Sequence, residues 1–400
     1  MSRVDLIVRL AVVAELALIG ITWRLWFCAT DFPRVPLVPL FLYLPTPVVR
    51  MLSVAFIGSL IATVISGWRQ NSLSGRRLTA ATLLPGCLTV CCNQHCLQPW
   101  HWLFLILLVY QLMPARQSLV WMLCRLLPCI YIFAAASRFG PGIDVGMSRQ
   151  IMVALRHLSG LRTVATDSQV VTWMCILAAT AETVIGVLLL VPRMHRIGMM
   201  SAVIMHVILM AILGPVGLRQ HPAVVIWNSF LTAWVILLYW RRSDLRQQDR
   251  FCAALVSAIS FLWPTLALFG VTDSWTGWQL YSPRPEVVRI QVHADAVSKL
   301  PPCVRPHVTG PDLLEDWCTV RIDRWSLQSA GVPLYPEARF QLAITVAITQ
   351  GISDDEQVRV RVNSPARPNW WVRTKTDYGG RSEILRATRN FQLNAEASGR

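Results

Sequence analysis

Lysine is almost absent from this sequence, which contains only Lys299 and Lys375 among its 400 residues. Charged residues of all kinds make up 15% of the chain, well below the share found in an average soluble domain. Hydrophobic residues make up 54%, and the mean hydropathy is +0.46. This balance excludes an ordinary soluble globular protein and indicates an integral membrane protein.

The motifs of soluble enzymes are also missing. The sequence has no Walker phosphate-binding loop, no glycine-rich dinucleotide fingerprint, no H-E-x-x-H and no G-x-S-x-G. Any chemistry must therefore use residues of the membrane helices or of the C-terminal tail. The sequence assigns no catalytic residue and leaves open whether the chain is an enzyme.

The eleven cysteines include no C-x-x-C pair, which excludes a thioredoxin-type motif and a zinc ribbon. The run CCNQHC (91–96) has the composition of a metal cluster, but it lies where an apolar helix meets a short loop. We interpret its cysteines as small buried hydrophobes and predict no metal site. Cys303 and Cys318 are the only cysteines of the polar tail. A disulfide between them is a candidate if the tail lies outside the cytoplasm.

The net charge of +15 comes almost entirely from arginine. The basic residues lie between apolar runs and not in one stripe, which is typical of topology-setting loops and of contact with anionic headgroups. We therefore expect the lipid bilayer as a partner and no nucleic acid.

Apolar runs long enough to cross about 30 Å of hydrocarbon predict an all-α membrane bundle of eight or nine spans. The first run carries Arg9 and Glu15 and lacks a small-residue cleavage site, so we expect an uncleaved helix. A shorter run is expected to be broken by Pro85. The runs lie at 6–27, 51–67, 78–92, 100–113 joined to 117–137, 170–191, 198–214, 222–240 and 252–270.

Arginine-bearing short loops at 68–77, 193–196 and 241–250, together with Arg116, fall on one side of the membrane if there are nine spans. The positive-inside rule makes that side cytoplasmic. We therefore expect a multi-pass protein of the inner (plasma) membrane with a cytoplasmic N-terminus and an extracytoplasmic tail. The basic loop 138–169 lies on the other side, where an amphipathic helix at the interface would accommodate it.

The composition changes near residue 271, and the tail from 271 to 400 is predicted to be a small α+β domain. A helix is expected at 335–350, and Trp275, Trp278 and Tyr281 suit the aromatic belt of the interface. Strand-like alternation occurs at 287–295, 318–325, 358–362 and 370–374.

Glu182 lies near the middle of the run 170–191, where an ionised carboxylate costs several kcal/mol unless a partner answers it. Arg125 and His206 lie at similar distances from the starts of their own runs, so neighbouring helices could bring the three side chains together. Small residues would let another helix approach Glu182 closely. These are Ala178, Ala179, Ala181 and Gly186, and the further polar candidates inside the runs are Glu15 and Asn228.

Two interpretations of this polar cluster stay open. In the first, Arg125 and Glu182 form a pair that only fixes helix register, and His206 donates a hydrogen bond. In the second, the cluster lines a cavity for a quinone or another small molecule, or relays protons, because ionisable groups inside membranes often mark such sites. No second His or Cys follows His206 at the spacing of a metal site.

Two segments of 117–241 resemble the DoxX-like and MauE-like family of four-helix membrane modules. They are CRLLPCIYIFAAASRFG (124–140) and AETVIGVLLLVPRMHRIG (181–198). The resemblance implies that Arg125, Arg138, Glu182 and Gly186 hold family positions, with Arg138 standing where the family usually has lysine. It implies a chain made of N-terminal helices (1–116), the four-helix module (117–241), a last helix (242–270) and the tail (271–400).

The resemblance further implies a redox-associated role, as an accessory or electron-transfer component beside a partner oxidoreductase or in its maturation. The segment NQHCLQPWHW (93–102) is similar to bacterial relatives of vitamin K-dependent carboxylases, but the activated lysine base of that family has no counterpart in the membrane region. The alternatives are a non-catalytic scaffold whose tail recruits a partner, or a transporter. The transporter is ranked lower because no pair of interrupted spans repeats between two halves.

Overall fold

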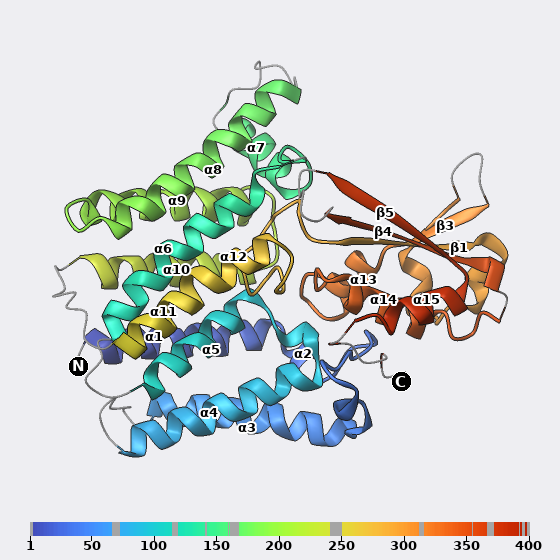
Figure 1. Cartoon of the computed structure of the whole chain (residues 1–400), viewed down its shortest axis with the longest axis horizontal. Coiled ribbons are helices and arrows are strands. Elements are labelled where there is room, and N and C mark those ends of the chain that lie inside the picture. Colours follow the sequence, from blue (N-terminus) through green and yellow to red (C-terminus); the bar gives the residue numbers. More distant parts are fainter. Residues whose placement is uncertain are drawn as a thin grey trace. The chain divides into compact units, whose positions relative to one another are not determined.

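The computed structural model describes residues 3–65, 73–113, 119–140, 142–158, 160, 168–240, 250–311, 316–353, 355–365, 372–391, 393 and 397. In this part of the chain the protein is mostly helical and carries one antiparallel sheet near the C-terminus (Figure 1). The chain forms two compact units that alternate along the sequence. Unit 1 comprises Met1–Ile21, Ser59–Leu83 and Pro99–Arg284, and unit 2 comprises Thr22–Gly58, Leu84–Gln98 and Pro285–Arg400.

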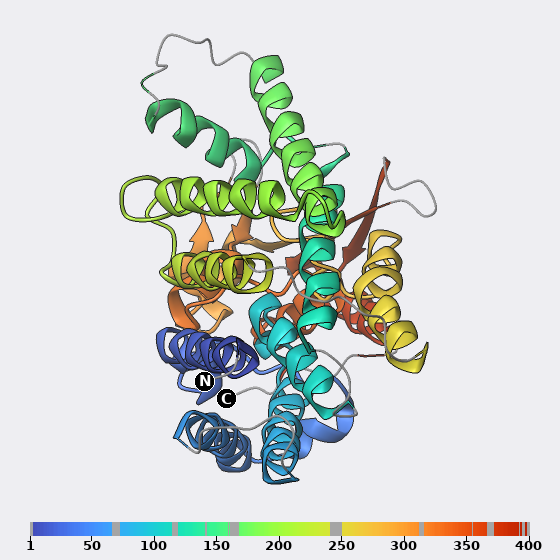
Figure 2. The same cartoon turned by 90° about the vertical axis from the view of Figure 1, so that its left-hand side faces the viewer.

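The helices of unit 1 pack along long apolar faces. Within it α1, α10 and α9 lie side by side in that order, and α6 packs against α8 (Figures 1 and 2). The Trp234 indole donates to the Ile7 carbonyl, and the Arg3 guanidinium binds the Leu237 and Leu238 carbonyls, so α1 is fixed to α10. The helices are α1 (Arg3–Ile21), α5 (Pro99–Leu112), α6 (Leu119–Arg138), α7 (Met147–Leu158), α8 (Ser168–Leu190), α9 (His195–Leu213), α10 (Ala223–Tyr239), α11 (Arg250–Ser257) and α12 (Trp263–Leu268).

Five of the described helices are long and apolar enough to cross a bilayer, as the composition predicted. They are Thr46–Ile65, Leu119–Arg138, Gln169–Leu190, His195–Leu213 and Phe251–Leu268; the last runs through α11, a π-helical turn (Ala258–Leu262) and α12. Two further predicted spans, α5 and α10, are shorter apolar helices. The basic loop 138–169 contains the helix α7, whose apolar face packs on α8 and α9.

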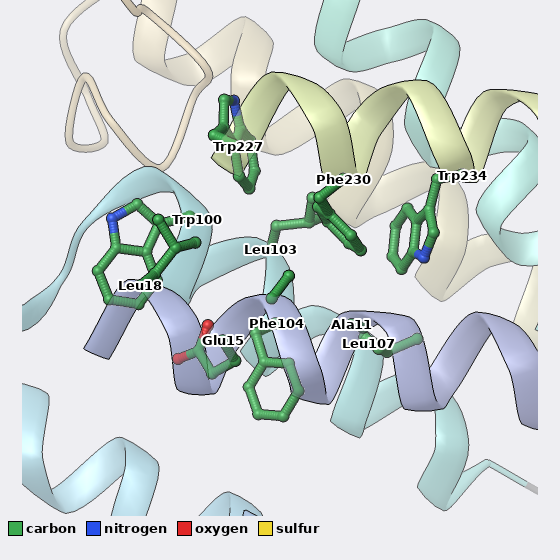
Figure 3. Close-up of a pocket in the computed structure, with 11 residues that line it drawn as sticks. Ala11, Glu15, Leu18, Trp100, Leu103, Phe104, Leu107, Trp227, Phe230 and Trp234 are labelled. Atoms are coloured by element: carbon green, nitrogen blue, oxygen red, sulfur yellow. The ribbon is translucent and has the colours of Figure 1, made fainter. Parts of the chain in front are cut away.

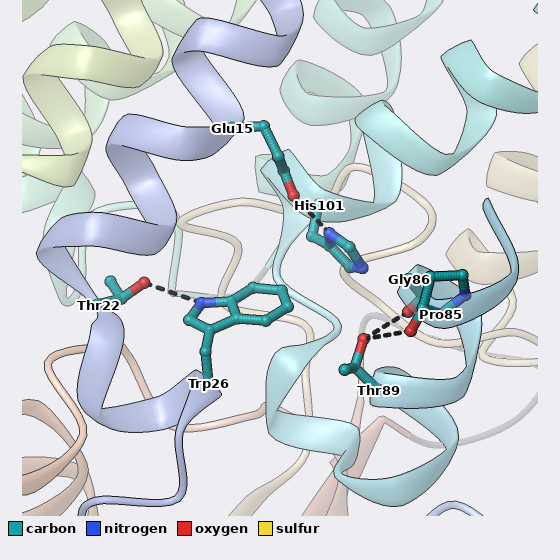
Figure 4. Close-up of polar contacts among 7 residues, drawn as sticks. All are labelled: Glu15, Thr22, Trp26, Pro85, Gly86, Thr89 and His101. Carbon is teal, nitrogen blue, oxygen red and sulfur yellow. Dashed lines mark hydrogen bonds and ion pairs between the residues drawn. The ribbon is translucent and has the colours of Figure 1, made fainter. Parts of the chain in front are cut away.

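Pro85 does not break its helix, contrary to the prediction. It lies inside α4 (Leu73–Cys92), which follows α3 (Thr46–Ile65). The Thr89 hydroxyl donates to the Pro85 carbonyl over 3.0 Å and to the Gly86 carbonyl over 2.7 Å (Figure 4). Threonine often bonds carbonyls three or four residues earlier in a helix, and these bonds do not replace the missing Pro85 N–H, whose helix partner would be the Ala81 carbonyl. The backbone of α4 nevertheless continues through Pro85 to Cys92.

Unit 2 is built around the five-stranded sheet, with strand order β2-β3-β1-β4-β5. The helices α14 and α15 pack against one of its faces (Figure 1). The strands are β1 (Val287–His293), β2 (Val308–Thr309), β3 (Trp317–Val320), β4 (Val358–Pro365) and β5 (Arg373–Gly379), and the α-helices are α2 (Trp23–Trp26), α13 (Ile322–Ser329), α14 (Ala338–Ile348) and α15 (Arg381–Thr388). Short 3₁₀ helices cover Pro39–Tyr43, Gln94–Cys96, Ala294–Lys299, Arg305–His307 and Asp355–Gln357.

One predicted strand is half helix. The alternating segment 318–325 is strand only as far as Val320, and α13 begins at Ile322. Arg321 binds Asp323 through two hydrogen bonds of 2.9 and 2.7 Å, which holds an acid in the first turn of α13, where the helix dipole favours it. The last predicted strand, 370–374, overlaps β5 from Arg373, while 370 and 371 lie outside the described residues.

Early segments of the chain supply part of the core of unit 2. The Phe32 ring lies 4.6 Å from Trp325 and 5.2 Å from His95, centroid to centroid. The His95 Nε2 atom lies 3.0 Å from the Pro333 carbonyl, and Arg339 donates to the Gln94 side chain. The unit is therefore not the contiguous tail that the composition change marked out.

The cysteines singled out in the sequence are free thiols. Cys303 is half-buried in a turn and Cys318 is buried on β3, so the candidate disulfide is not formed. Cys92 and Cys96 are buried near the end of α4 and in the 3₁₀ helix that follows. In the described segments, no group of three or more His, Cys, Asp or Glu residues is arranged to hold a metal ion.

Candidate functional site

A cavity of about 150 Å³ lies among α6, α8, α9 and α10 of unit 1. Each helix contributes residues spaced by three or four, so each turns one face to the cavity. These residues include Tyr131, Ala134 and Arg138 of α6, Cys175, Ala178 and Glu182 of α8, His206, Leu209 and Leu213 of α9, and Asn228 and Leu231 of α10. The wall is therefore mainly apolar, with polar side chains at defined positions.

The register of α6 against α8 is set by Gly186. A Cβ atom at this position would lie 2.6 Å from Cγ1 of Ile132 and 2.8 Å from the Pro128 carbonyl oxygen. Only a residue without a side chain permits this approach, as the small residues near Glu182 predicted. Because the middle of α6 meets Gly186, the turn of α8 that carries Glu182 lies toward the C-terminal end of α6.

Arg138 is the residue found at that end. Its Nη1 atom donates to Oε2 of Glu182 over 2.5 Å, and the Glu182 residue is 9% exposed. Nε of Arg138 is buried and has no hydrogen-bond partner within the described chain. An ion pair in a low-dielectric environment stabilises the fold only when its remaining donors are also satisfied. Nε of Arg138 is such a donor, and it belongs to a residue that lines the cavity.

Arg125 does not join this pair, contrary to the expectation from its position along the run. Its guanidinium lies 5.5 Å from the centre of the Trp121 ring, and Arg125 does not line the cavity. The physical reason is direction: α6 and α8 run antiparallel, so residues equally far from the starts of their helices lie at different depths. Arg125 is on the far side of Pro128 from Arg138.

His206 lies in a chain of hydrogen bonds on the same cavity. The Asn228 amide nitrogen donates to the Val224 carbonyl over 2.8 Å, so its oxygen is left to accept from Nδ1 of His206 over 2.9 Å. With the proton on Nδ1, the imidazole is neutral and Nε2 accepts from the Tyr131 hydroxyl over 2.8 Å. The orientation of the Asn228 amide therefore determines which atom donates and which accepts in each of these three hydrogen bonds.

The segment after α12 closes part of the cavity with strained backbone. Leu280 and Tyr281 line it, and Tyr281 has a φ of +57°. Trp278, with a φ of +65°, is fully buried and so is unavailable to the interfacial belt predicted for it. Bulky residues in the left-handed region cost about 1–3 kcal/mol and cluster at binding sites.

A second buried charged pair joins α1 to α5 in unit 1. Nδ1 of His101 lies 2.6 Å from Oε1 of Glu15 (Figure 4). Glu15 is 2% exposed and His101 is not exposed at all. One proton lies between the imidazole and the carboxylate, so this hydrogen bond joins α1 to α5 in the interior of unit 1.

Glu15 also borders a small pocket walled by aromatic rings. Figure 3 shows Trp227, Phe230 and Trp234 on α10 facing α1, with Trp100 close to Glu15. The pocket volume is about 10 Å³, which is room for about one water molecule. Trp227 lines both this pocket and the larger cavity.

The larger cavity has the properties of a site for a small ring-bearing molecule. A volume of about 150 Å³ accommodates a benzene-sized ring. The wall supplies an unsatisfied guanidinium donor, a phenol and a carboxylate, and these can donate or accept hydrogen bonds and move protons at the polar edge of a ring.

Two polar residues of these sites were missed in the sequence, Tyr131 and His101. Tyr131 lies two turns before Arg138 on α6, so helical spacing from Arg138 would have placed it on the same face. His101 was noted only within the segment 93–102. A search for a partner for Glu15 was the available signal, because a buried acid requires one.

No protein-family profile, no curated protein and no solved structure that was compared with the chain matches it. The geometry of the cavity therefore carries the functional argument.

Proposed function

We propose that this chain is a multi-pass protein of the inner (plasma) membrane whose cavity binds the ring of a quinone or of a chemically similar molecule. In this proposal eight or nine spans anchor the protein, the N-terminus is cytoplasmic and the C-terminal tail is extracytoplasmic. The protein acts as a redox-associated component beside a partner oxidoreductase, as the resemblance of 117–241 to DoxX-like and MauE-like modules implies. The convergence of Arg138–Glu182 and Tyr131–His206–Asn228 on one ring-sized cavity carries the proposal.

A quinone can reversibly take up two electrons and two protons to become a quinol. Its carbonyl oxygens are acceptors, which suits the buried Nε of Arg138. Glu182 holds that guanidinium in place, and His206 and Asn228 fix the direction of the Tyr131 hydroxyl. The apolar side chains of α9 and α10 exclude water from the ring.

Binding is tested with the full-length protein in mild detergent, using ubiquinone-1 and menadione as probes and tryptophan fluorescence as the readout, since Trp227 lines the cavity. We expect saturable quenching by at least one probe. Arg138→Gln should weaken the affinity by about tenfold or more, because it removes a charged donor. Mass spectrometry of co-purified lipids should also detect a quinone.

The matched control is Glu15→Gln, which makes the same chemical change as Glu182→Gln at a carboxylate that does not line the cavity and keeps an acceptor for His101. Glu15→Gln should leave the affinity unchanged within about twofold, while Glu182→Gln lowers it. If neither probe binds saturably, or if both variants lose affinity equally, the cavity is not a quinone site. That result would favour the alternative function, a non-catalytic scaffold whose tail recruits a partner.

A further inference from the structure

The sheet of unit 2 has one apolar face and one basic face. On β1 and β4 the valines and the isoleucine of the apolar face are buried, and this face is the one that α14 and α15 cover. The alternate residues point to the opposite face. On β1, β4 and β5 these include Arg289, Arg359, Arg361, Lys375 and Asp377, which we call the basic face.

The strand register concentrates positive charge on the basic face. Arg289 lies directly opposite Arg361, and Lys375 is opposite Asn363, one step along the same face. Like charges directly opposite each other destabilise a sheet. Asp377 accepts hydrogen bonds of 2.6 and 3.2 Å from Arg361, but of the five residues named on the basic face four are basic and one is acidic.

One cation of the basic face, Arg359, is held in place by two neighbouring side chains. The Arg359 guanidinium lies 4.2 Å from the centre of the Trp317 ring, and its Nε donates to Gln291 on the neighbouring strand over 2.9 Å. Arg289 and Lys375 are exposed. Alternate residues of a strand lie about 7 Å apart and neighbouring strands about 5 Å apart, so the cations form a closely spaced array on one face of the sheet.

We propose that the basic face binds the anionic headgroups of a phospholipid surface. Guanidinium groups pair with phosphate through two parallel hydrogen bonds, and a closely spaced array of cations complements the negative charge of an anionic headgroup layer. If α12 is anchored in a bilayer, the sheet stays close to that bilayer. Only residues 269–286 connect α12 to β1, and they span at most roughly 60 Å. This inference needs membrane anchoring but does not depend on the cavity or its ligand.

The test uses the full-length protein in nanodiscs of zwitterionic phosphatidylcholine, mixed with separate vesicles that contain phosphatidylglycerol. We expect these vesicles to carry the protein upward in a flotation gradient, pure phosphatidylcholine vesicles not to do so, and added salt to release it. Arg289→Gln with Lys375→Gln should lower the co-floating fraction about tenfold or more, because each basic residue near an anionic surface contributes separately.

The matched control is Arg386→Gln with Arg389→Gln, which removes the same charge from exposed positions in α15 and the residue after it. This variant should float with the phosphatidylglycerol vesicles within about twofold of the parent protein. Equal loss in both variants, or no capture by phosphatidylglycerol vesicles, overturns the proposal. Capture of soluble polyglutamate without capture of vesicles also overturns it and assigns the basic face to an acidic protein. Unchanged circular dichroism verifies that each variant is folded.

Discussion

The His101 imidazole and the Glu15 carboxylate share a hydrogen bond of 2.6 Å at a place where solvent reaches neither side chain. The two residues belong to α1 and α5, so the bond ties two helices together inside unit 1. Removing one member of such a pair leaves the other buried without this hydrogen bond, whereas replacing both by apolar residues removes the cost of burying them.

We therefore expect Glu15→Leu alone to lower the free energy of unfolding by about 3–5 kcal/mol. The double variant Glu15→Leu with His101→Phe should lose clearly less than the sum of the two single variants. Unfolding in mixed detergent micelles gives all three values and so completes a double-mutant cycle. Additive losses would show that the two side chains do not interact.

The glycine at 186 gives a second prediction. Gly186→Ala should destabilise the packing of α6 on α8 by about 1–3 kcal/mol, because the new methyl group meets a backbone carbonyl that cannot move aside. Gly58→Ala in α3 is the control, since nothing lies within 4 Å of its added Cβ. The same unfolding measurement should show little change or a slight gain for Gly58→Ala. A smaller loss at 186 than at 58 would contradict the register described for α6 and α8.

Arg138 and Arg125 provide a comparison within one helix. Arg138→Gln leaves Glu182 buried without its ion pair and should cost about 3 kcal/mol of unfolding free energy. Arg125→Gln removes a contact with the Trp121 ring and should cost about 1 kcal/mol or less. Denaturation of the two variants under identical conditions decides the matter, and an equal or reversed order would refute the pairing of Arg138 with Glu182.

His95 predicts a pH dependence of stability. Burial lowers the pKa of His95 from 6.5 to about 4, although its contact with the Pro333 carbonyl acts in the opposite direction. Between these two values the unfolded state binds the proton and the folded state does not, so stability falls as the pH falls. The loss from pH 6.5 to pH 4 should amount to about 3 kcal/mol.

The measurement for His95 is the unfolding free energy of the full chain as a function of pH. Burial also lowers the pKa of His307, so the parent protein alone does not isolate the effect. His95→Gln keeps a donor for the Pro333 carbonyl and cannot titrate. This variant should lose stability less steeply on acidification, and an unchanged slope would exclude His95 as the cause.

Helix positions could be predicted from the sequence because an apolar run of sufficient length has few alternatives in a bilayer. The predicted runs at 170–191, 198–214 and 222–240 coincide closely with α8, α9 and α10. The sequence underestimates α4 because a proline usually interrupts a helix, whereas α4 runs through Pro85 to Cys92. Local sequence therefore located the helices better than it located their ends or interruptions.

The partners of the buried polar residues were less accessible to prediction. Distances from the starts of the apolar runs favour Arg125 as the partner of Glu182. The partner is Arg138, because α6 and α8 run in opposite directions and such distances do not then measure a common depth. The role of Gly186 was foreseen because small residues mark close helix contacts. The contribution of Phe32 and His95 to unit 2 was not, because aromatic contacts between distant segments leave no periodic signal.

The interleaving of the two units affects the order in which the protein can mature. Phe32 and His95 leave the ribosome long before Trp325 and Phe340, the rings against which they pack. Until synthesis nears its end these early aromatic side chains have no finished core to enter, and they are exposed to chaperones and proteases. A shortened chain that lacks the C-terminal segment would keep them in that state permanently, so point substitutions are the cleaner means of separating the activities of the two units.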